Sequence, residues 1–212
     1  MIRSGLIGVL NYGAGNLGSV MNALERLGAK ARFVQGPEEL KAPDSSPYGK
    51  LLFPGDGHFG TTMESLENSG YAEVLRGWLK ADKSFLGICI GLQVLFEASE
   101  EAPGVKGLGV MKGTVKRFPG RKVPQIGWNS TAAQPASRLF RGLSENAFFY
   151  YIHSYYVESG ETGTVAATAE YYLRYCAAVE RSNAAAVQFH PEKSGAVGLA
   201  LLENWLQDGA VQ

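Results

Sequence analysis

Residues 85–93 read Phe-Leu-Gly-Ile-Cys-Ile-Gly-Leu-Gln, and their pattern is the most specific indication of the fold in the chain. The apolar run over 85–88 is typical of a buried strand, and the apolar side chains that follow Cys89 recur at helical spacing. Between them lies the pattern Gly-x-Cys-x-Gly, which is typical of a sharp turn from strand to helix that exposes a nucleophile above a sheet. The turn needs small neighbours because the backbone at the nucleophile is strained. The stretch therefore predicts an α/β sheet with a reactive cysteine at a strand end.

The residues before this stretch alternate between strand and helix patterns. Short apolar runs predict strands over 6–10, 31–34 and 51–53. Helical spacing of apolar residues predicts helices over 17–27 and 71–79. Such alternation favours a mainly parallel sheet that helices cover on both faces.

The second half of the chain is richer in aromatic and β-branched runs. A final helix is expected over 195–206, with Ser194 as its N-cap. Strands are expected over 110–118, 147–157, 164–169, 172–179 and 184–189.

Composition narrows the class of protein. The 212 residues show no linker or repeat, so we expect one domain over residues 1–212. Lys+Arg and Asp+Glu each number 20, and this zero net charge argues against nucleic-acid binding. Two cysteines make no disulfide framework, and no apolar run approaches the roughly 18 residues of a membrane span. We therefore expect a soluble cytoplasmic protein without a membrane partner.

A thiolate nucleophile needs a base and a group that orients the base. His190 follows the apolar run 184–189, and Glu192 lies two residues further, close enough to reach the same imidazole. Taken singly, each is more often a surface charge at a strand end. Together with Cys89 they predict a Cys–His–Glu triad, and the positive end of the helix after Cys89 would favour its thiolate.

The segment 53–60 follows a predicted strand and holds three glycines. Backbone N–H groups in such a turn can bind a developing oxyanion, although alone the pattern also fits an ordinary loop. The histidines His58, His153 and His190 have no cysteine or carboxylate cluster at ligand spacing, so we expect no metal site. We expect no cofactor either.

Several blocks together carry a resemblance to a known family. Residues 87–93 and 189–194 resemble the class I (triad) glutamine amidotransferases. Four more blocks are similar to the glutaminase subunits of imidazole glycerol phosphate synthase, and the likeness runs from Ile7 to Leu206. These blocks are 11–17, 54–59, 124–129 and 151–156.

The resemblance implies a reaction and roles for residues. Cys89 would attack the carboxamide of glutamine, His190 would relay the proton, and Glu192 would orient the imidazole, with a glutamyl thioester as intermediate. Backbone N–H groups would hold the oxyanion, one from Ile90 and one from Gly55-Asp56. Contacts to the α-carboxylate and α-amino groups of glutamine would come from Gly57, Gln93, His153, Ser154 and Tyr155.

The resemblance also implies a partner and a fold. Ammonia would pass to a (β/α)8-barrel synthase subunit in a heterodimer that serves histidine biosynthesis. The docking residues would be Asn16, Trp128 and Lys193. The implied fold is a flavodoxin-like, open, mainly parallel sheet flanked by helices, with a smaller, mostly antiparallel sheet from the second half.

Three positions depart from the usual pattern of the family. Asp56 replaces a small apolar residue in the proline-glycine turn, and Ile90 and Leu92 replace leucine and methionine. The last two keep apolar size, so we expect little consequence. The Asp56 side chain is expected to face solvent, because only its backbone is needed.

Three other functions remain open from the residues. One is a triad glutaminase that serves another acceptor, as in anthranilate, carbamoyl phosphate or pyridoxal phosphate synthases. The blocks at 11–17 and 124–129 argue against it. The others are a hydrolase or peptidase of similar fold and a binding module without activity, for which the triad would be unused.

Overall fold

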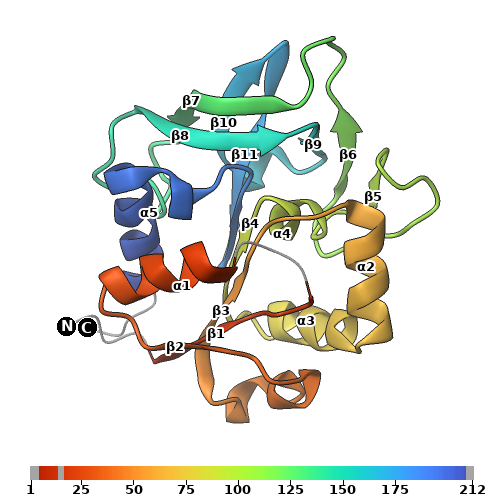
Figure 1. The fold of residues 1–212 in the computed structure, drawn as a ribbon, viewed down its shortest axis with the longest axis vertical. Helices are drawn as coiled ribbons and strands as arrows, with labels where there is room; N and C mark the ends of the chain where they lie inside the picture. The colour runs from red at the N-terminus through yellow and green to blue at the C-terminus, as the bar shows by residue number, and fades with distance from the viewer. Residues whose placement is uncertain (1–4, 14–16, 209–212) are drawn as a thin grey trace.

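The computed structural model describes residues 5–13 and 17–208, and Figure 1 shows a twisted sheet with helices on both sides. Five strands of the sheet run parallel, in the order β2-β1-β3-β4-β12. Because parallel strands align their ends, the segments after β3, β4 and β12 meet at one edge. These strands are β1 (Leu6–Val9), β2 (Ala31–Phe33), β3 (Tyr48–Phe53), β4 (Ser84–Ile88) and β12 (Ala184–Val187).

Beyond β12 the sheet continues with antiparallel strands, in the order β11-β10-β7-β8. A branch leaves the sheet at β11, where β9 pairs and leads to β6 and β5. The predicted fold class, a mainly parallel sheet flanked by helices with a smaller, mostly antiparallel sheet from the second half, is confirmed, and the antiparallel strands join the parallel ones in one continuous sheet. These strands are β5 (Ala98–Ser99), β6 (Gly113–Arg117), β7 (Gln125–Ala133), β8 (Asn146–His153), β9 (Tyr155–Ser159), β10 (Val165–Tyr171) and β11 (Leu173–Arg181).

Helices cover the two faces of the parallel strands. In Figure 1, α1 and α5 lie on one side of these strands and α2 and α3 on the other. Alternate residues of β3 enter two separate cores: Leu52 packs with the first pair of helices, whereas Leu51 and Phe53 pack with the second. The helices are α1 (Leu17–Arg26), α2 (Phe59–Asn68), α3 (Tyr71–Lys80), α4 (Ile90–Gln93) and α5 (Gly195–Gln207), with short 3₁₀ turns at Pro37–Leu40, Pro43–Ser45, Thr162–Thr164 and Pro191–Lys193.

The predicted helix after Cys89 is much shorter than its apolar pattern suggests. It ends at Gln93, because the next carbonyls accept hydrogen bonds from a distant loop. The carbonyl of Val94 accepts from Leu108 N at 2.7 Å, and that of Leu95 accepts from Met111 N at 3.0 Å. A loop that returns over this segment therefore replaces the helical bonds.

Three further differences concern where strands and helices lie. Helix α2 begins at Phe59, within the segment expected to be a turn, and the ring of His58 caps it by accepting from Gly60 N at 3.1 Å. Strand β7 was not predicted. The single strand expected over 147–157 is two strands that are interrupted at Ser154, whose carbonyl accepts from Phe118 N.

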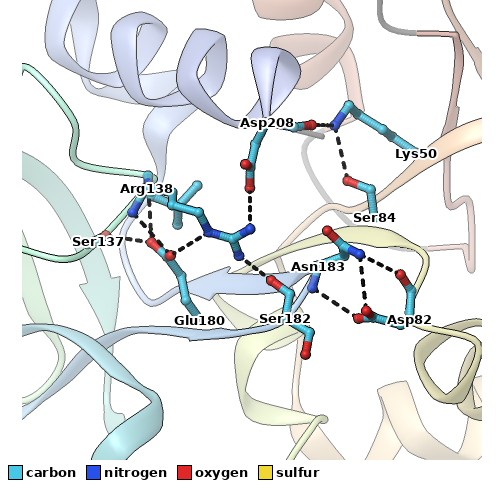
Figure 2. Close-up of polar contacts among 10 residues, drawn as sticks. Lys50, Asp82, Ser84, Ser137, Arg138, Glu180, Ser182, Asn183 and Asp208 are labelled. Carbon is cyan, nitrogen blue, oxygen red and sulfur yellow. Dashed lines mark hydrogen bonds and ion pairs between the residues drawn. The ribbon is translucent and has the colours of Figure 1, made fainter. Parts of the chain in front are cut away.

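A polar cluster, drawn in Figure 2, secures the end of α5 at the amino edge of the parallel strands. Cys89 follows β4 and therefore lies at the opposite edge. The backbone carbonyl of Asp208 accepts from Lys50 Nζ at 2.5 Å, and its carboxylate pairs with Arg138 at 3.0 Å. Arg138 also contacts Glu180 and the carbonyl of Ser182. The cluster therefore stabilises the sheet at the edge that lies away from Cys89.

Within residues 5–13 and 17–208, no helix combines the length and apolar character that a membrane crossing requires.

Candidate active site

Cys89 lies directly after β4 in a backbone conformation that L-residues rarely adopt, with φ 50° and ψ −103°. Its N–H donates to the carbonyl of Val187 at 2.7 Å. A Cβ at Gly87 would lie 2.4 Å from the carbonyl oxygen of Gly91, and a Cβ at Gly91 would lie 2.8 Å from that of Phe53. The two glycines of the Gly-x-Cys-x-Gly pattern are therefore required sterically, as the sequence pattern predicts.

His190 and Glu192 form a buried pair beside this turn. The distance from His190 Nδ1 to Glu192 Oε1 is 2.8 Å, and the two side chains are 2% and 1% exposed. The 3₁₀ turn Pro191–Lys193 brings the carboxylate back to the imidazole. Ser194 does not cap α5 with its side chain, contrary to expectation, because its hydroxyl donates to the carbonyl of His190 at 2.6 Å and accepts from Tyr150 N.

The electrostatic surroundings of His190 favour its charged form. Burial lowers the pKa of His190, but the interactions with Cys89 and Glu192 outweigh it and raise that pKa to about 10. His190 Nε2 is buried and makes no hydrogen bond within the described part of the chain. The imidazole is therefore oriented by Glu192 at one nitrogen and free at the other, as a proton carrier requires.

A pocket of about 240 Å³ opens over Cys89 and brings together residues from distant segments. Gly55 packs against the Cys89 turn, where a Cβ would come within 1.9 Å of the carbonyl oxygen of Ile88. Most of the expected site residues meet here, while Glu192 lies behind His190. The lining comprises Asp56, Gly57, Cys89, Ile90, Gln93, Glu101, Pro124, Ile152, His153, Ser154, Tyr155 and His190.

The proline-glycine turn is held by a residue that the sequence did not single out. The hydroxyl of Tyr12 donates to the carbonyls of Pro54 at 3.2 Å and Asp56 at 2.9 Å. Gly57 has φ 137°, a conformation that favours glycine. The side chain of Asp56 is exposed, as expected.

The expected glutamine contacts Gln93 and His153 both bind the backbone of Tyr155. Its carbonyl accepts from Gln93 Nε2 at 3.2 Å and from His153 Nδ1 at 2.7 Å. His153 Nε2 faces the side chains of Gln125 and Tyr175, and burial lowers the pKa of His153 to about 4. The ring is therefore neutral and serves to position the segment that lines the pocket.

Two more residues at the site were missed in the sequence. The amide of Gln188 lies against the sulfur of Cys89, with Nε2 at 3.6 Å from Sγ. Glu101 lines the pocket, and its carboxylate accepts from Phe59 N at 2.7 Å. A polar residue at the end of the apolar run 184–187 was the available signal for Gln188. We find no comparable signal for Glu101.

An exposed apolar surface adjoins the pocket, and we call it the β7–β8 face. Its members alternate along two antiparallel strands, so they share one side of the sheet. Ile126 and Trp128 on β7 are 61% and 56% exposed, and Phe148 on β8 is 57% exposed. Patches of this kind mark interaction sites. The face comprises Ile126, Trp128, Phe148, Tyr150 and Ile152, the last of which also lines the pocket.

The remaining expected site residues lie outside the pocket. Lys193 is half-buried in the turn that carries Glu192, and Asn16 falls outside the described residues. The described residues contain no group of three or more His, Cys, Asp or Glu side chains that could hold a metal ion.

Comparisons of the sequence and of the structure with known proteins identify the same family. A family model of class-I glutamine amidotransferases matches residues 8–208. The imidazole glycerol phosphate synthase subunit HisH of Desulfitobacterium hafniense is 44% identical over 209 residues, which cover 97% of this chain and 97% of that protein. HisH of Deinococcus radiodurans is 45% identical over 94% of this chain and 92% of its own length.

Solved structures share the fold at much lower sequence identity. PurLQS from Thermotoga maritima has a TM-score of 0.77 at 16% identity, over 96% of this chain and 98% of that chain. A glutamine amidotransferase crystal structure has a TM-score of 0.73 at 21% identity, over 95% of this chain and 99% of that chain. By its family match and its full-length relatives, this chain belongs to the class I glutamine amidotransferase family, within the group of imidazole glycerol phosphate synthase HisH subunits.

Proposed function

We propose that this chain hydrolyses L-glutamine to glutamate and ammonia at Cys89, as one domain over residues 1–212, and passes the ammonia to a (β/α)8-barrel synthase subunit. The observation that carries the proposal is the buried pair of His190 and Glu192, 2.8 Å apart, at the pocket over Cys89. A base that is oriented at one nitrogen and free at the other, beside a cysteine on a strained turn, is the arrangement that thiol acyl transfer needs.

The chemistry proceeds in two steps. The Cys89 thiolate attacks the carboxamide carbon, and the imidazolium of His190 donates its proton to the departing nitrogen, which leaves as ammonia. His190 then takes a proton from water, the hydroxide attacks the glutamyl thioester, and glutamate and the thiolate are released. Glu192 orients the His190 ring throughout and stabilises it whenever it carries the extra proton.

The oxyanion of each step would be held by backbone N–H groups. Ile90 is the first residue of α4, so no carbonyl within the helix takes its N–H. The second donor would come from Gly55-Asp56, which packs against the Cys89 turn. Preorganised donors of this kind contribute strongly to catalysis.

The pocket offers complementary groups for the free amino acid. Glu101 supplies a carboxylate for the α-ammonium group, and Gln93, whose Nε2 contacts Tyr155 and Gln188, would use its Oε1 for the substrate. Gly57, Ser154 and Tyr155 line the same pocket, and we expect their backbone to bind the α-carboxylate. Zero net charge suits this zwitterionic substrate.

The β7–β8 face is the proposed docking surface for the barrel subunit, with Trp128, Lys193 and Asn16 as contacts. The face adjoins the pocket through Ile152, so a subunit seated there would lie beside the site where ammonia forms. In the barrel, ammonia would react with a phosphorylated ribulosyl aminoimidazole intermediate. The products would be imidazole glycerol phosphate and aminoimidazole carboxamide ribotide, within histidine biosynthesis.

Glutamine hydrolysis should be measured for the chain alone and with the barrel subunit and its ribotide substrate. We expect weak activity alone and strong stimulation by the loaded partner. Vigorous activity alone, or indifference to the partner, would favour a hydrolase or a glutaminase for another acceptor.

Two matched variants test the assigned nucleophile. Cys89→Ala should abolish turnover with glutamine but leave turnover of the complex with free ammonia. Cys176→Ala, which changes the other cysteine, buried in the core, should keep glutamine turnover. Retained glutamine hydrolysis in Cys89→Ala would refute the proposal.

A further inference from the structure

Gln188 follows β12 directly, and the register of the parallel strands places it opposite Cys89. Val187 pairs with Ile88, so the next residues on the two strands, Gln188 and Cys89, leave the sheet side by side. Gln188 is fully buried, and its Nε2 lies 3.6 Å from Cys89 Sγ. A buried amide that contacts a reactive sulfur calls for a chemical explanation, because burial of a polar group is costly unless it forms hydrogen bonds.

The orientation of this amide follows from its neighbour. Gln93 Nε2 lies 3.2 Å from the carbonyl of Tyr155 and 3.1 Å from Gln188 Oε1. The backbone carbonyl of Tyr155 can only accept, so the Gln93 amide group must point one N–H bond at it, and the second N–H of the same nitrogen faces Gln188. Gln188 must then present its oxygen to Gln93, which leaves its NH₂ end toward the sulfur. The Tyr155 carbonyl and Gln93 thus decide which end of Gln188 meets Cys89.

We infer that Gln188 is a further catalytic residue, whose side-chain N–H donates to the sulfur of Cys89 and stabilises its thiolate. The inference rests on the proposed function, in which Cys89 is the nucleophile. A hydrogen bond to a charged acceptor is about twice as strong as one between neutral groups, so the contact favours the thiolate over the thiol. Because Gln188 is neutral, it stabilises the thiolate without taking the proton that His190 must carry.

The contact also links the nucleophile to the glutamine pocket. The chain of hydrogen bonds runs from the Tyr155 carbonyl through Gln93 and Gln188 to Cys89. His153 donates to the same carbonyl at 2.7 Å. The segment proposed to bind substrate and the sulfur that attacks it therefore share one buried network.

The test is the pH dependence of alkylation of Cys89 by iodoacetamide, measured on the full chain. Cys176 is 6% exposed, so we expect it to react slowly. Mass spectrometry of the peptides distinguishes alkylation of Cys176 from alkylation of Cys89. Gln188→Met and Gln188→Leu remove the donor and keep a side chain of similar size. In both variants we expect the pH at which alkylation of Cys89 is half-maximal to rise by about one unit. Below that pH, such a shift means a thiolate fraction that is about tenfold smaller. We expect kcat/KM for glutamine to fall about tenfold at pH 7 and to recover at higher pH.

Gln125→Leu provides the matched control, because Gln125 is a buried glutamine near the same pocket that contacts His153 instead of the sulfur. Its alkylation midpoint should equal that of the unsubstituted chain. Equal midpoints in all variants, or a loss of activity that is the same at every pH, would overturn the inference. If Cys89→Ala kept glutamine turnover, the proposed function would fail independently of the alkylation result.

A second measurement needs no substitution at Gln188. In the ¹⁵N-labelled chain, the side-chain amide resonances of Gln188 should move as Cys89 titrates and should not move over that range in Cys89→Ala. Resonances that ignore the titration of Cys89 would contradict the contact, even if the Gln188 variants did not fold.

Discussion

The hydroxyl of Tyr12 donates a hydrogen bond of 2.9 Å to the backbone carbonyl of Asp56, 44 residues away in the chain. The same hydroxyl reaches the carbonyl of Pro54 at 3.2 Å. These carbonyls flank the Gly55–Asp56 peptide, from which the second oxyanion donor is proposed to come. One buried side chain from the segment after β1 therefore fixes the turn on both sides of that donor.

Tyr12→Phe keeps the ring, which packs 4.9 Å from that of Phe53, and removes only the hydroxyl. We expect the free energy of unfolding to fall by about 1 kcal/mol, because two carbonyls lose a donor. We also expect kcat for glutamine to fall severalfold, since the turn is less preorganised. Urea unfolding and steady-state kinetics measure the two effects.

Tyr71→Phe is the control, because the Tyr71 hydroxyl also donates to a backbone carbonyl, that of Val34, away from the pocket. It should lower stability without changing kcat. An increase of kcat in Tyr12→Phe would show instead that the tether holds the turn in a resting arrangement.

Gly55→Ala should damage the site through steric overlap. The added Cβ would lie 1.9 Å from the carbonyl oxygen of Ile88 and 2.7 Å from Cβ of Cys89, so the turn and the nucleophile must move apart. We expect a loss of about 1–3 kcal/mol in stability and about 100-fold in kcat/KM.

Gly77→Ala is the matched control, because nothing lies within 4 Å of the added Cβ in α3. It should stabilise the helix by about 1 kcal/mol and leave activity unchanged. Equal activity in the two alanine variants would refute the steric argument.

His153 should make the fold sensitive to acid. Burial lowers its pKa from 6.5 to about 4, so between these values the unfolded chain binds a proton that the folded chain does not. Stability therefore decreases as pH falls from about 6.5 to about 4, by up to about 3 kcal/mol from this group. In His153→Gln, which cannot titrate, urea unfolding should show a shallower decrease over the same range. Identical pH slopes would contradict a neutral buried ring.

Local signals account for what the sequence predicted. Apolar runs mark the parallel strands, and the spacing of Gly87 and Gly91 around Cys89 reflects a steric requirement that any chain with this turn must meet. His190 and Glu192 are two residues apart, so their pairing is also local.

The features that were missed depend on contacts between distant segments. Tyr12 reaches Asp56, and Gln188 meets Gln93 across 95 residues, so no local pattern reveals them. Helix α4 stops at Gln93 because a loop beyond residue 104 donates to the carbonyls of the residues that follow it, Val94 and Leu95. Strand β7 was missed for two reasons. Small and polar residues dominate its sequence, and its exposed residues are apolar, so the usual alternation of buried apolar and exposed polar residues is absent.

Asp56→Val restores the small apolar residue that is usual in the resembled family. The Asp56 side chain is exposed, and the turn is held through its backbone carbonyl, so the substitution keeps the tether to Tyr12. Removal of a negative charge at the pocket lining favours a developing oxyanion. We expect glutaminase activity of the assembled complex to stay the same or rise. A large loss would mean that the carboxylate itself has a role.

Trp128→Ala should weaken the complex with the barrel subunit and leave the isolated chain almost unchanged. Trp128 is 56% exposed, and its main ring contact is an edge-to-face pair with Tyr150 at 6.2 Å between centroids, so its removal opens no core cavity. A buried tryptophan at an interface contributes about 2 kcal/mol or more, which corresponds to a dissociation constant roughly 30-fold higher. Titration calorimetry measures this, with Lys80→Ala on the distant helix α3 as a control that should bind normally (Figure 1). Normal affinity in Trp128→Ala, with glutamine turnover fully stimulated by the loaded partner, would place the docking surface away from the β7–β8 face.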